Sequence, residues 1–327
     1  MRTPVRPPPW PRVPLAMDER AAPKARLDPD LRSAPLFAIP FHWRWALPLW
    51  RLALRLARSP VGPGVEVRDH VEAGVHVRLY RPREHASSAA LLWLHGGGFI
   101  LGTPRADDAR CGAWSRQLGL TVVSVDYRLA PERPFPAALD DAHAAWVWLQ
   151  GAAEGLGVDR ARVAIGGGSA GGGLAACLAQ RLRDEGGMQP AAQLLVYPML
   201  DDRTAARREL DAAGHLVWHN RSNRAGWAAY LGRAPGPPEL PIYAAAARRV
   251  DLRGLPPAWI GVGDLDLFLE EGRGYARRLE ASGVAAVLHE VAGAPHGFDV
   301  LAAETPLARA FVASQVAFLR AALIAAP

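Results

Sequence analysis

Gly167-Gly168-Ser169-Ala170-Gly171 is the stretch that decides the fold of this 327-residue chain. It follows a short apolar run, residues 163–165, and precedes an apolar stretch predicted to be helical up to residue 183. A serine in a G-x-S-x-G pattern at a strand-to-helix turn is typical of a nucleophile elbow, where small neighbours leave room for a strained backbone. A glycine-rich loop that binds phosphate at a helix start is the alternative, but no P-loop lysine follows. The pattern therefore favours nucleophilic chemistry at Ser169.

A second glycine motif, His95-Gly96-Gly97-Gly98, directly follows another apolar run, residues 89–94. Glycines in such a loop let peptide N–H groups approach one developing oxyanion, which side chains would block. We therefore predict an oxyanion hole formed by the N–H groups of Gly97 and Gly98, with Ala170, the residue after the nucleophile, as third donor. The histidine of the motif is expected to fix the loop by hydrogen bonding and to take no part in catalysis.

A serine hydroxyl needs a base to activate it, and the base needs an acid to orient it. His296, in Pro295-His296-Gly297-Phe298, follows the last predicted strand and is the expected base. Asp264 and Asp266 both follow the predicted strand 258–262. Two residues apart in an extended segment, they face the same way, so their spacing does not choose the acid. The chain order serine, aspartate, histidine is that of an α/β-hydrolase.

Together, these motifs resemble the hormone-sensitive-lipase-like family of α/β-hydrolase esterases over roughly residues 65–325. Besides the serine block, the shared blocks are HGGGF at His95–Phe99, YRLAPE at Tyr127–Glu132, YPML at Tyr197–Leu200 and PHGF at Pro295–Phe298. The resemblance implies a Ser-His-Asp triad, an acyl-enzyme, and activity on short- to medium-chain acyl esters, aryl esters included.

The resemblance also selects the acid. In the family it lies six residues before a glycine in a D-x-L-x-D-E-G-like segment, and counting back from Gly272 gives Asp266, with Asp264 in reserve. Two positions of that segment differ from the family pattern. A further departure is Gly168, where many relatives have aspartate, and it bears on hydrogen bonding near the elbow.

Predicted strands alternate with predicted helices along most of the chain, which indicates the α/β class with a mostly parallel central sheet flanked by helices. The predicted strands are 65–67, 75–79, 89–94, 121–125, 163–165, 194–196, 258–262 and 284–291, and the helices 107–118, 137–149, 169–183 and 307–323. Two helices without a strand between them, 207–213 and 222–231, indicate an insertion. We divide the chain into an N-terminal extension with cap helices (1–58), a first core part (59–202), a cap insertion (203–240) and a second core part (241–327).

Residues 36–58 are expected to form an amphipathic helix. Trp43, Leu47, Trp50 and Leu54 form one apolar stripe at helical spacing, and arginines form another. Pro48 either kinks the helix or marks the first turn of a shorter one. The helix is a lid over a binding cleft or lies on a membrane surface; we favour the lid, because a short stripe usually faces a core. Too many arginines and prolines interrupt the segment for a transmembrane helix.

The amino-acid composition of the chain limits the classes of partner and cofactor that we expect. The formal charge is +6, spread thinly as arginine without a run of like charges, so no nucleic-acid partner is expected. The two cysteines, Cys111 and Cys177, are expected to be free thiols in a cytoplasmic, reducing compartment. We find no residues at metal-ligand spacing and no dinucleotide fingerprint, so neither a metal nor an organic cofactor is expected. The first 35 residues look poorly ordered, and either Met1 or Met17 is the start.

The predicted function is a serine carboxylesterase acting on small-molecule esters through Ser169, Asp266 and His296. Phe99, Trp43 and Trp218 are candidates for lining an apolar substrate pocket. A related acyl hydrolase acting on amides, lactones or carbamates is the nearest alternative, since the same triad serves it. A membrane-surface lipase that uses residues 36–58 and a small-molecule receptor built on this scaffold are the others.

Overall fold

A computed structural model describes residues 23–36, 44–56, 59–72, 74–84 and 87–324. The strands are β1 (Val65–Glu72), β2 (Val75–Pro82), β3 (Ala90–Leu94), β4 (Thr121–Val125), β5 (Val163–Gly168), β6 (Gln193–Val196), β7 (Ala258–Gly263) and β8 (Ala286–Val291). The α-helices are α1 (Leu47–Leu56), α2 (Asp108–Leu118), α3 (Ala137–Leu156), α4 (Ala170–Glu185), α5 (Asp202–Ala206), α6 (Asn220–Leu231), α7 (Leu269–Ala281), α8 (Phe298–Leu301) and α9 (Pro306–Leu323).

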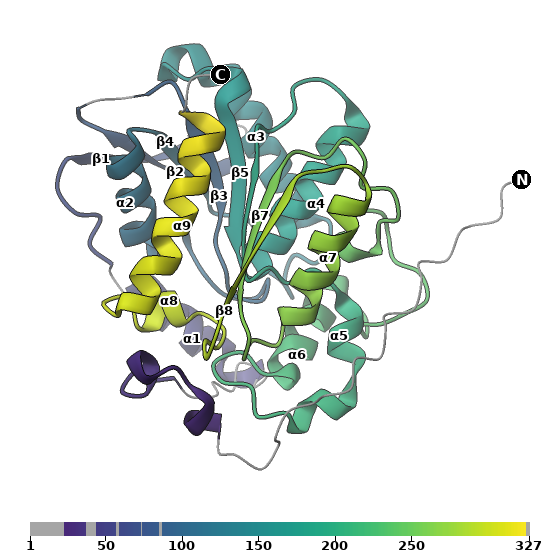
Figure 1. The fold of residues 1–327 in the computed structure, drawn as a ribbon. Coiled ribbons are helices and arrows are strands. Elements are labelled where there is room, and N and C mark those ends of the chain that lie inside the picture. Colours follow the sequence, from purple (N-terminus) through teal and green to yellow (C-terminus); the bar gives the residue numbers. More distant parts are fainter. Residues whose placement is uncertain (1–22, 37–43, 57–58, 73, 85–86, 325–327) are drawn as a thin grey trace, which may run out of the picture.

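The strands form one sheet in the order β1-β2-β4-β3-β5-β6-β7-β8. From β4 to β8 all neighbours run parallel, and only the β1–β2 and β2–β4 pairs are antiparallel. Helices cover both faces of the sheet (Figure 1). The predicted mostly parallel sheet flanked by helices is therefore confirmed.

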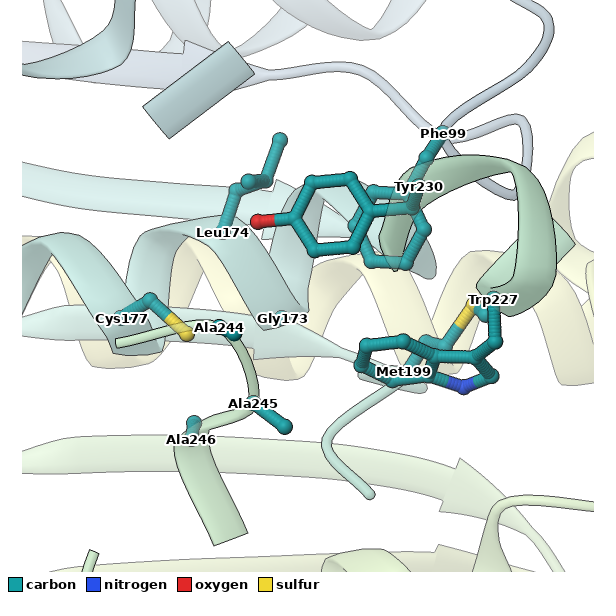
Figure 2. A pocket seen from close by; sticks show the side chains of 10 residues that line it. All are labelled: Phe99, Gly173, Leu174, Cys177, Met199, Trp227, Tyr230, Ala244, Ala245 and Ala246. Atoms are coloured by element: carbon teal, nitrogen blue, oxygen red, sulfur yellow. The ribbon is translucent and has the colours of Figure 1, made fainter. Parts of the chain in front are cut away.

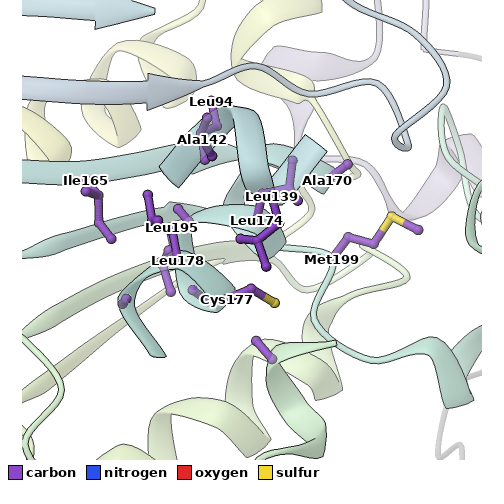
Figure 3. Packing of buried hydrophobic residues seen from close by; sticks show 14 of the residues in the cluster. Leu94, Leu139, Ala142, Ile165, Ala170, Leu174, Cys177, Leu178, Leu195 and Met199 are labelled. Atoms are coloured by element: carbon purple, nitrogen blue, oxygen red, sulfur yellow. The ribbon is translucent and has the colours of Figure 1, made fainter. Parts of the chain in front are cut away.

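Alternate residues of the central strands serve two hydrophobic cores. Leu92 and Leu94 of β3 belong to the core beneath α3, α4 and α7, which Figure 3 shows around α4. Leu91 and Trp93 point the other way, into the core beneath α2 and α9. Because β3, β4, β5 and β6 are buried on both faces, they are continuous apolar or small-residue runs without polar alternation.

Most predicted elements exist, but α3 runs seven residues past the predicted end at 149, β1 runs five past its predicted end at 67, and other elements differ in kind. β5 extends to Gly168, so its end is built of glycines that gave no strand signal. Helix α7 was not predicted, because its sequence LEEGRGYARRLEA contains two glycines and few apolar residues. The first predicted helix of the insertion, 207–213, is instead the short α5 followed by a 3₁₀ helix, Arg208–Ala212.

The N-terminal segment is more ordered than expected where the structure describes it. Leu27, Leu31 and Leu36 are buried in the core beneath α2 and α9. The N–H group of Asp28 donates to the carbonyl of Gly293 at 3.0 Å. The expectation of poor order is therefore wrong for residues 23–36, because leucines of this segment pack into the core beneath α2 and α9.

Helix α1 is the shorter of the two expected forms, with Pro48 in its first turn, where its missing N–H is tolerated. Leu47 is buried, and Trp50 and Leu54 pack against the same core as α3 and α4. Trp43 lies outside the described residues. Within the described ranges, every helix is too short or too polar to cross a membrane.

Candidate active site

Ser169 sits at a sharp turn between β5 and α4. Its backbone has φ 55° and ψ −118°, a strained conformation that a side-chain-bearing residue rarely adopts. The turn is possible because its neighbours are glycines: a Cβ at Gly167 would collide with the backbone of Gly171, and a Cβ at Gly171 with the carbonyl of Leu94. The predicted elbow is thus held by contacts between backbones that come closer than any side chain allows.

The structure brings Ser169, His296 and Asp266 together in one hydrogen-bonded chain. His296 Nε2 lies 2.9 Å from Ser169 Oγ, and His296 Nδ1 lies 2.7 Å from Asp266 Oδ2. The other carboxylate oxygen, Oδ1, accepts from the N–H of Phe268 at 2.9 Å. With Nδ1 protonated toward the carboxylate, Nε2 is free to take the serine proton. All three residues are at least 94% buried, with relative exposures of 6%, 6% and 4%.

The two candidate acids have different partners, although they are only two residues apart. Asp264 Oδ1 accepts from the N–H of Gly293 at 2.7 Å and fixes the loop after β8. Asp266 alone of the two contacts the imidazole. The structure therefore places at His296 the carboxylate that the resemblance selected.

Gly97 and Gly98 lie in a left-handed stretch, with φ values of 125° and 60°. The loop runs beside the nucleophile, since a Cβ built on Gly96 would lie 3.5 Å from the Cβ of Ser169. Among the described residues, the N–H groups of Gly97 and Gly98 donate to no backbone carbonyl. Ala170 is the first residue of α4, so its N–H is one of the donors that a helix cannot satisfy. The three predicted donors thus belong to the loop beside Ser169 and to the first residue of the helix that follows it.

His95 contacts its own loop. Its Nδ1 lies 2.8 Å from the Gly96 carbonyl, and its ring stacks on Tyr127, whose hydroxyl donates to the His95 carbonyl at 2.7 Å. Burial lowers the pKa of His95, so the ring is neutral and donates through Nδ1. This arrangement agrees with the predicted positioning role.

Trp218 and Phe99, both expected at the substrate pocket, lie at the oxyanion loop. A Cβ on Gly98 would collide with the indole of Trp218, whose ring centroid is 6.5 Å from that of His296. Phe99 stacks on Tyr230 of α6 with centroids 4.0 Å apart. Phe99 and Tyr230 both line a small cavity beside α4 (Figure 2).

The acidic residues after β4 form ion pairs with arginines. Glu132 pairs with Arg51, Asp140 with Arg181, and Asp141 with Arg128. Within the part of the chain that the structure describes, no group of three or more histidine, cysteine or acidic side chains is placed to hold a metal ion.

Comparison with known proteins assigns the fold to a family. A sequence profile described as the alpha/beta hydrolase fold matches residues 91–300. The chain belongs to this family. Esterase LipI of Mycobacterium tuberculosis is 35% identical over 321 residues, which cover 90% of this chain and 94% of that protein. Ethyl acetate hydrolase of Pseudomonas putida is 36% identical over 239 residues, 68% of this chain and 70% of that protein.

A solved structure makes the same link. That of a bacterial heroin esterase matches with a TM-score of 0.84 at 36% identity, covering 92% of this chain and 99% of the other. The predicted resemblance to hormone-sensitive-lipase-like esterases is confirmed, as is the predicted enzyme class, a carboxylic-ester hydrolase.

Sequence reasoning missed one buried carboxylate that supports the site of this esterase. Glu271 Oε2 accepts from the N–H groups of Leu200 and Asp201 at 2.6 and 2.8 Å. The loop it holds also carries Met199, whose N–H donates to the carbonyl of Ser169 at 3.0 Å. Burial raises the pKa of Glu271 well above its usual value. The glutamate before Gly272 in the family's acid segment was the signal that could have identified it.

Proposed function

We propose that this esterase hydrolyses carboxylic esters through an acyl-enzyme on Ser169. The serine Oγ attacks the ester carbonyl while His296 Nε2 takes its proton, and Asp266 stabilises the imidazolium that forms. The negative charge that develops on the carbonyl oxygen is bound by the N–H groups of Gly97, Gly98 and Ala170. Collapse of this intermediate breaks the ester C–O bond, and the leaving alkoxide receives the proton from His296.

The second half-reaction repeats these roles with water. His296 takes a proton from a water molecule, whose oxygen attacks the acyl carbonyl of the Ser169 ester. The same donors bind the second oxyanion, and its collapse returns the proton to the serine oxygen and releases the carboxylic acid. The observation that supports this proposal most strongly is the continuous chain from Ser169 Oγ through His296 to Asp266.

We further propose that the preferred acyl groups are short. The small cavity beside α4 is lined by Phe99 from the oxyanion loop and by Gly173 and Leu174, one turn after the nucleophile, and it is too narrow for even a water molecule (Figure 2). A long acyl chain on this side of the nucleophile would have to displace these side chains, so the packing favours a small acyl group. Similarity to a protein named ethyl acetate hydrolase supports the same size class.

A chain-length series of p-nitrophenyl esters tests both statements. We expect hydrolysis to be fastest with short acyl chains, and we expect Ser169→Ala to abolish it. Parallel assays on matched amides, lactones and carbamates test the alternative acyl hydrolases. A wild-type enzyme that turns over one of these but no ester would reject the ester proposal.

A second candidate is an esterase that works at a lipid surface through residues 36–58. Leu49, Leu52 and Leu56 of α1 and Trp45 of the 3₁₀ helix before it, Arg44–Ala46, face outward, with relative exposures of 62%, 53%, 70% and 71%. Tryptophan and leucine beside arginine are the residues with which amphipathic helices bind lipid headgroups. Co-sedimentation with anionic liposomes, comparing wild type with Leu49→Ser/Leu52→Ser, tests this. Equal amounts of both proteins in the pellet would reject it.

We also propose that residues 1–58 and 203–240 act as a cap over the core formed by 59–202 and 241–327. Arg51 of α1 donates to the carbonyl of Ile100 at 2.9 Å, and a Cβ on Gly226 of α6 would approach the carbonyl of Gly98 to 2.6 Å. Both parts therefore rest on the oxyanion loop. A cytoplasmic location agrees with the two free, buried cysteines, Cys111 and Cys177.

A further inference from the structure

A second buried polar cluster lies behind the imidazole of His296. The ring of Tyr197, in the loop after β6, meets the imidazole edge-on with centroids 4.6 Å apart. The Tyr197 hydroxyl donates to Asp299 Oδ1 at 2.9 Å. Burial raises the pKa of Tyr197, so the phenol keeps the proton that it donates.

Asp299 makes an ion pair with an arginine from a distant part of the chain. Arg110 of α2 donates through Nη2 to Asp299 Oδ2 at 2.6 Å, and the two side chains are 10% and 0% exposed. The guanidinium also lies over the rings of Trp93 and Trp114, at 5.6 and 5.8 Å. Burying an ion pair costs desolvation that its attraction seldom exceeds by much, so such a pair is weak evidence for stability alone.

The pair is attached directly to the turn that carries the histidine. Asp299 follows His296 by three residues, across Gly297, which has φ 69°. It lies in the first turn of α8, a helix of only four residues. Phe298 holds one side of this turn by packing against Phe311, with ring centroids 5.0 Å apart, and a fixed anchor at Asp299 adds a polar restraint on the motion of the imidazole.

We propose that Arg110, Asp299 and Tyr197 form a positioning cluster that holds His296 in line with Ser169. The proposal rests on the esterase mechanism above, and it adds residues that contact neither substrate nor reacting atoms. Asp299 anchors the turn to Arg110, and Tyr197 links the same carboxylate to the face of the imidazole. The negative charge of Asp299 also compensates the guanidinium, which would otherwise oppose protonation of His296 during the reaction.

Gly168 offers a direct way to test the charge requirement. A Cβ at this position meets only ordinary contacts: Trp93 at 3.6 Å, Arg110 Nη1 at 3.7 Å and Tyr197 at 3.8 Å. An aspartate there would therefore fit and would present its carboxylate to the same guanidinium. In this chain Asp299 is the carboxylate that pairs with Arg110. Gly168 has no side chain, which leaves room for a second carboxylate beside the same guanidinium.

The test combines removal of the carboxylate with its return at the other position. We expect Asp299→Asn to lower kcat by about 10- to 100-fold with little change in KM, because small displacements of a catalytic group cost that much. We also expect the acid limb of the kcat/KM profile to move to lower pH, because an uncompensated Arg110 disfavours the imidazolium. Asp266 and Tyr197 are titratable groups that contact His296 directly, and Asp299 lies behind Tyr197, bonded to its hydroxyl.

Adding Gly168→Asp to Asp299→Asn is expected to restore most of kcat and return the acid limb toward wild type. Asp202→Asn is the matched control, because it breaks a similarly buried arginine pair, with Arg248 at 2.8 Å, at the end of the first core part. We expect it to lower Tm and leave kcat and the pH profile in place. Tyr197→Phe keeps the ring and loses only the hydroxyl bond, so it tests the cluster even if Asp299→Asn does not fold; we expect a smaller loss of kcat.

Failure of this proposal is distinguishable from failure of the proposed function. A wild-type enzyme without esterase activity rejects the function itself. An active wild type whose folded Asp299→Asn variant keeps kcat and the acid limb, or whose Asp299→Asn loss is not restored by Gly168→Asp, overturns the positioning cluster. An unchanged kcat in Tyr197→Phe overturns the role of the hydroxyl bond.

Discussion

The elbow and the proposed cap are held by different kinds of contact. At the elbow, backbone meets backbone: Gly167 and Gly171 touch at distances that exclude a side chain, and Gly171 rests on the strand before the oxyanion loop. In the cap, side chains reach down to that loop. Arg51 donates to the Ile100 and Ala130 carbonyls, and the indole of Trp218 lies against Gly98.

This difference separates the chemistry from the choice of substrate. Backbone contacts at the elbow tolerate almost no substitution, so the positions of the serine and of the N–H donors are fixed with the fold. The side chains that make contacts in the proposed cap can be substituted without moving the sheet. We therefore expect changes at the elbow and triad to act on kcat, and changes in the cap to act on KM, on acyl preference and on stability.

The largest contrast is expected between the two aspartates after β7. Asp266→Asn keeps the size of the side chain but favours the wrong tautomer of His296, so kcat is expected to fall by about 10⁴-fold. Asp264→Asn weakens only the bond to the Gly293 N–H, so Tm should fall and kcat stay close to wild type. Steady-state kinetics of both variants measure the contrast; a larger loss of kcat at 264 would reverse the assignment.

The oxyanion loop should show the next largest effect. Gly97→Ala introduces a Cβ that collides with the Leu101 carbonyl at a φ of 125°, so the donors move and kcat is expected to fall by about 10²- to 10³-fold. Gly151→Ala is the matched control, since a Cβ there meets nothing within 4 Å and alanine favours the helix. Equal activity of the two variants would show that the loop does not bind the oxyanion.

A cap variant should change binding more than turnover. Arg51→Gln removes the bonds to the Ile100 and Ala130 carbonyls and the ion pair with Glu132. We expect a several-fold higher KM, a lower Tm and a kcat close to wild type. Kinetics on one short ester and thermal melts measure these changes, and a kcat loss as large as that of Gly97→Ala would remove the distinction between the two regions.

The smallest effect is expected at the hydroxyl of Tyr230. Within the described residues this buried oxygen has no hydrogen-bond partner, so Tyr230→Phe should be neutral or should stabilise the fold by about 1 kcal/mol.

Phe99→Ala, by contrast, enlarges the cavity and should shift the acyl preference toward longer chains. Denaturant melts and the p-nitrophenyl series measure both; strong destabilisation by Tyr230→Phe would reveal a partner for the hydroxyl.

The same contrast explains what could be predicted from the sequence. Close backbone approach demands glycine, so the elbow and the oxyanion loop leave motifs that can be read directly. The bounds of β4, Thr121–Val125, were predicted to the residue because this valine-rich run lies between a helix-ending glycine, Gly119, and the polar residue Asp126. Asp266 needed the resemblance as well, because spacing alone could not separate it from Asp264.

Contacts between residues that are far apart in the sequence leave no local pattern in that sequence. Arg110 and Asp299 are 189 positions apart, and neither stands in a periodic or motif context that connects them. The contact of Gly226 with Gly98 and the burial of Leu27 and Leu31 are likewise results of packing between distant segments. The identity of Trp43 as a pocket residue stays a prediction, because it lies outside the described residues.

The central claim is that the acyl group passes through Ser169, and rapid-quench mass spectrometry with p-nitrophenyl acetate tests it most directly. During turnover, we expect an added acetyl group on the peptide that contains Ser169, formed at the rate of the p-nitrophenol burst and missing in Ser169→Ala. Hydrolysis that persists in Ser169→Ala, or acetylation at another residue that forms and decays at the turnover rate, would contradict the account.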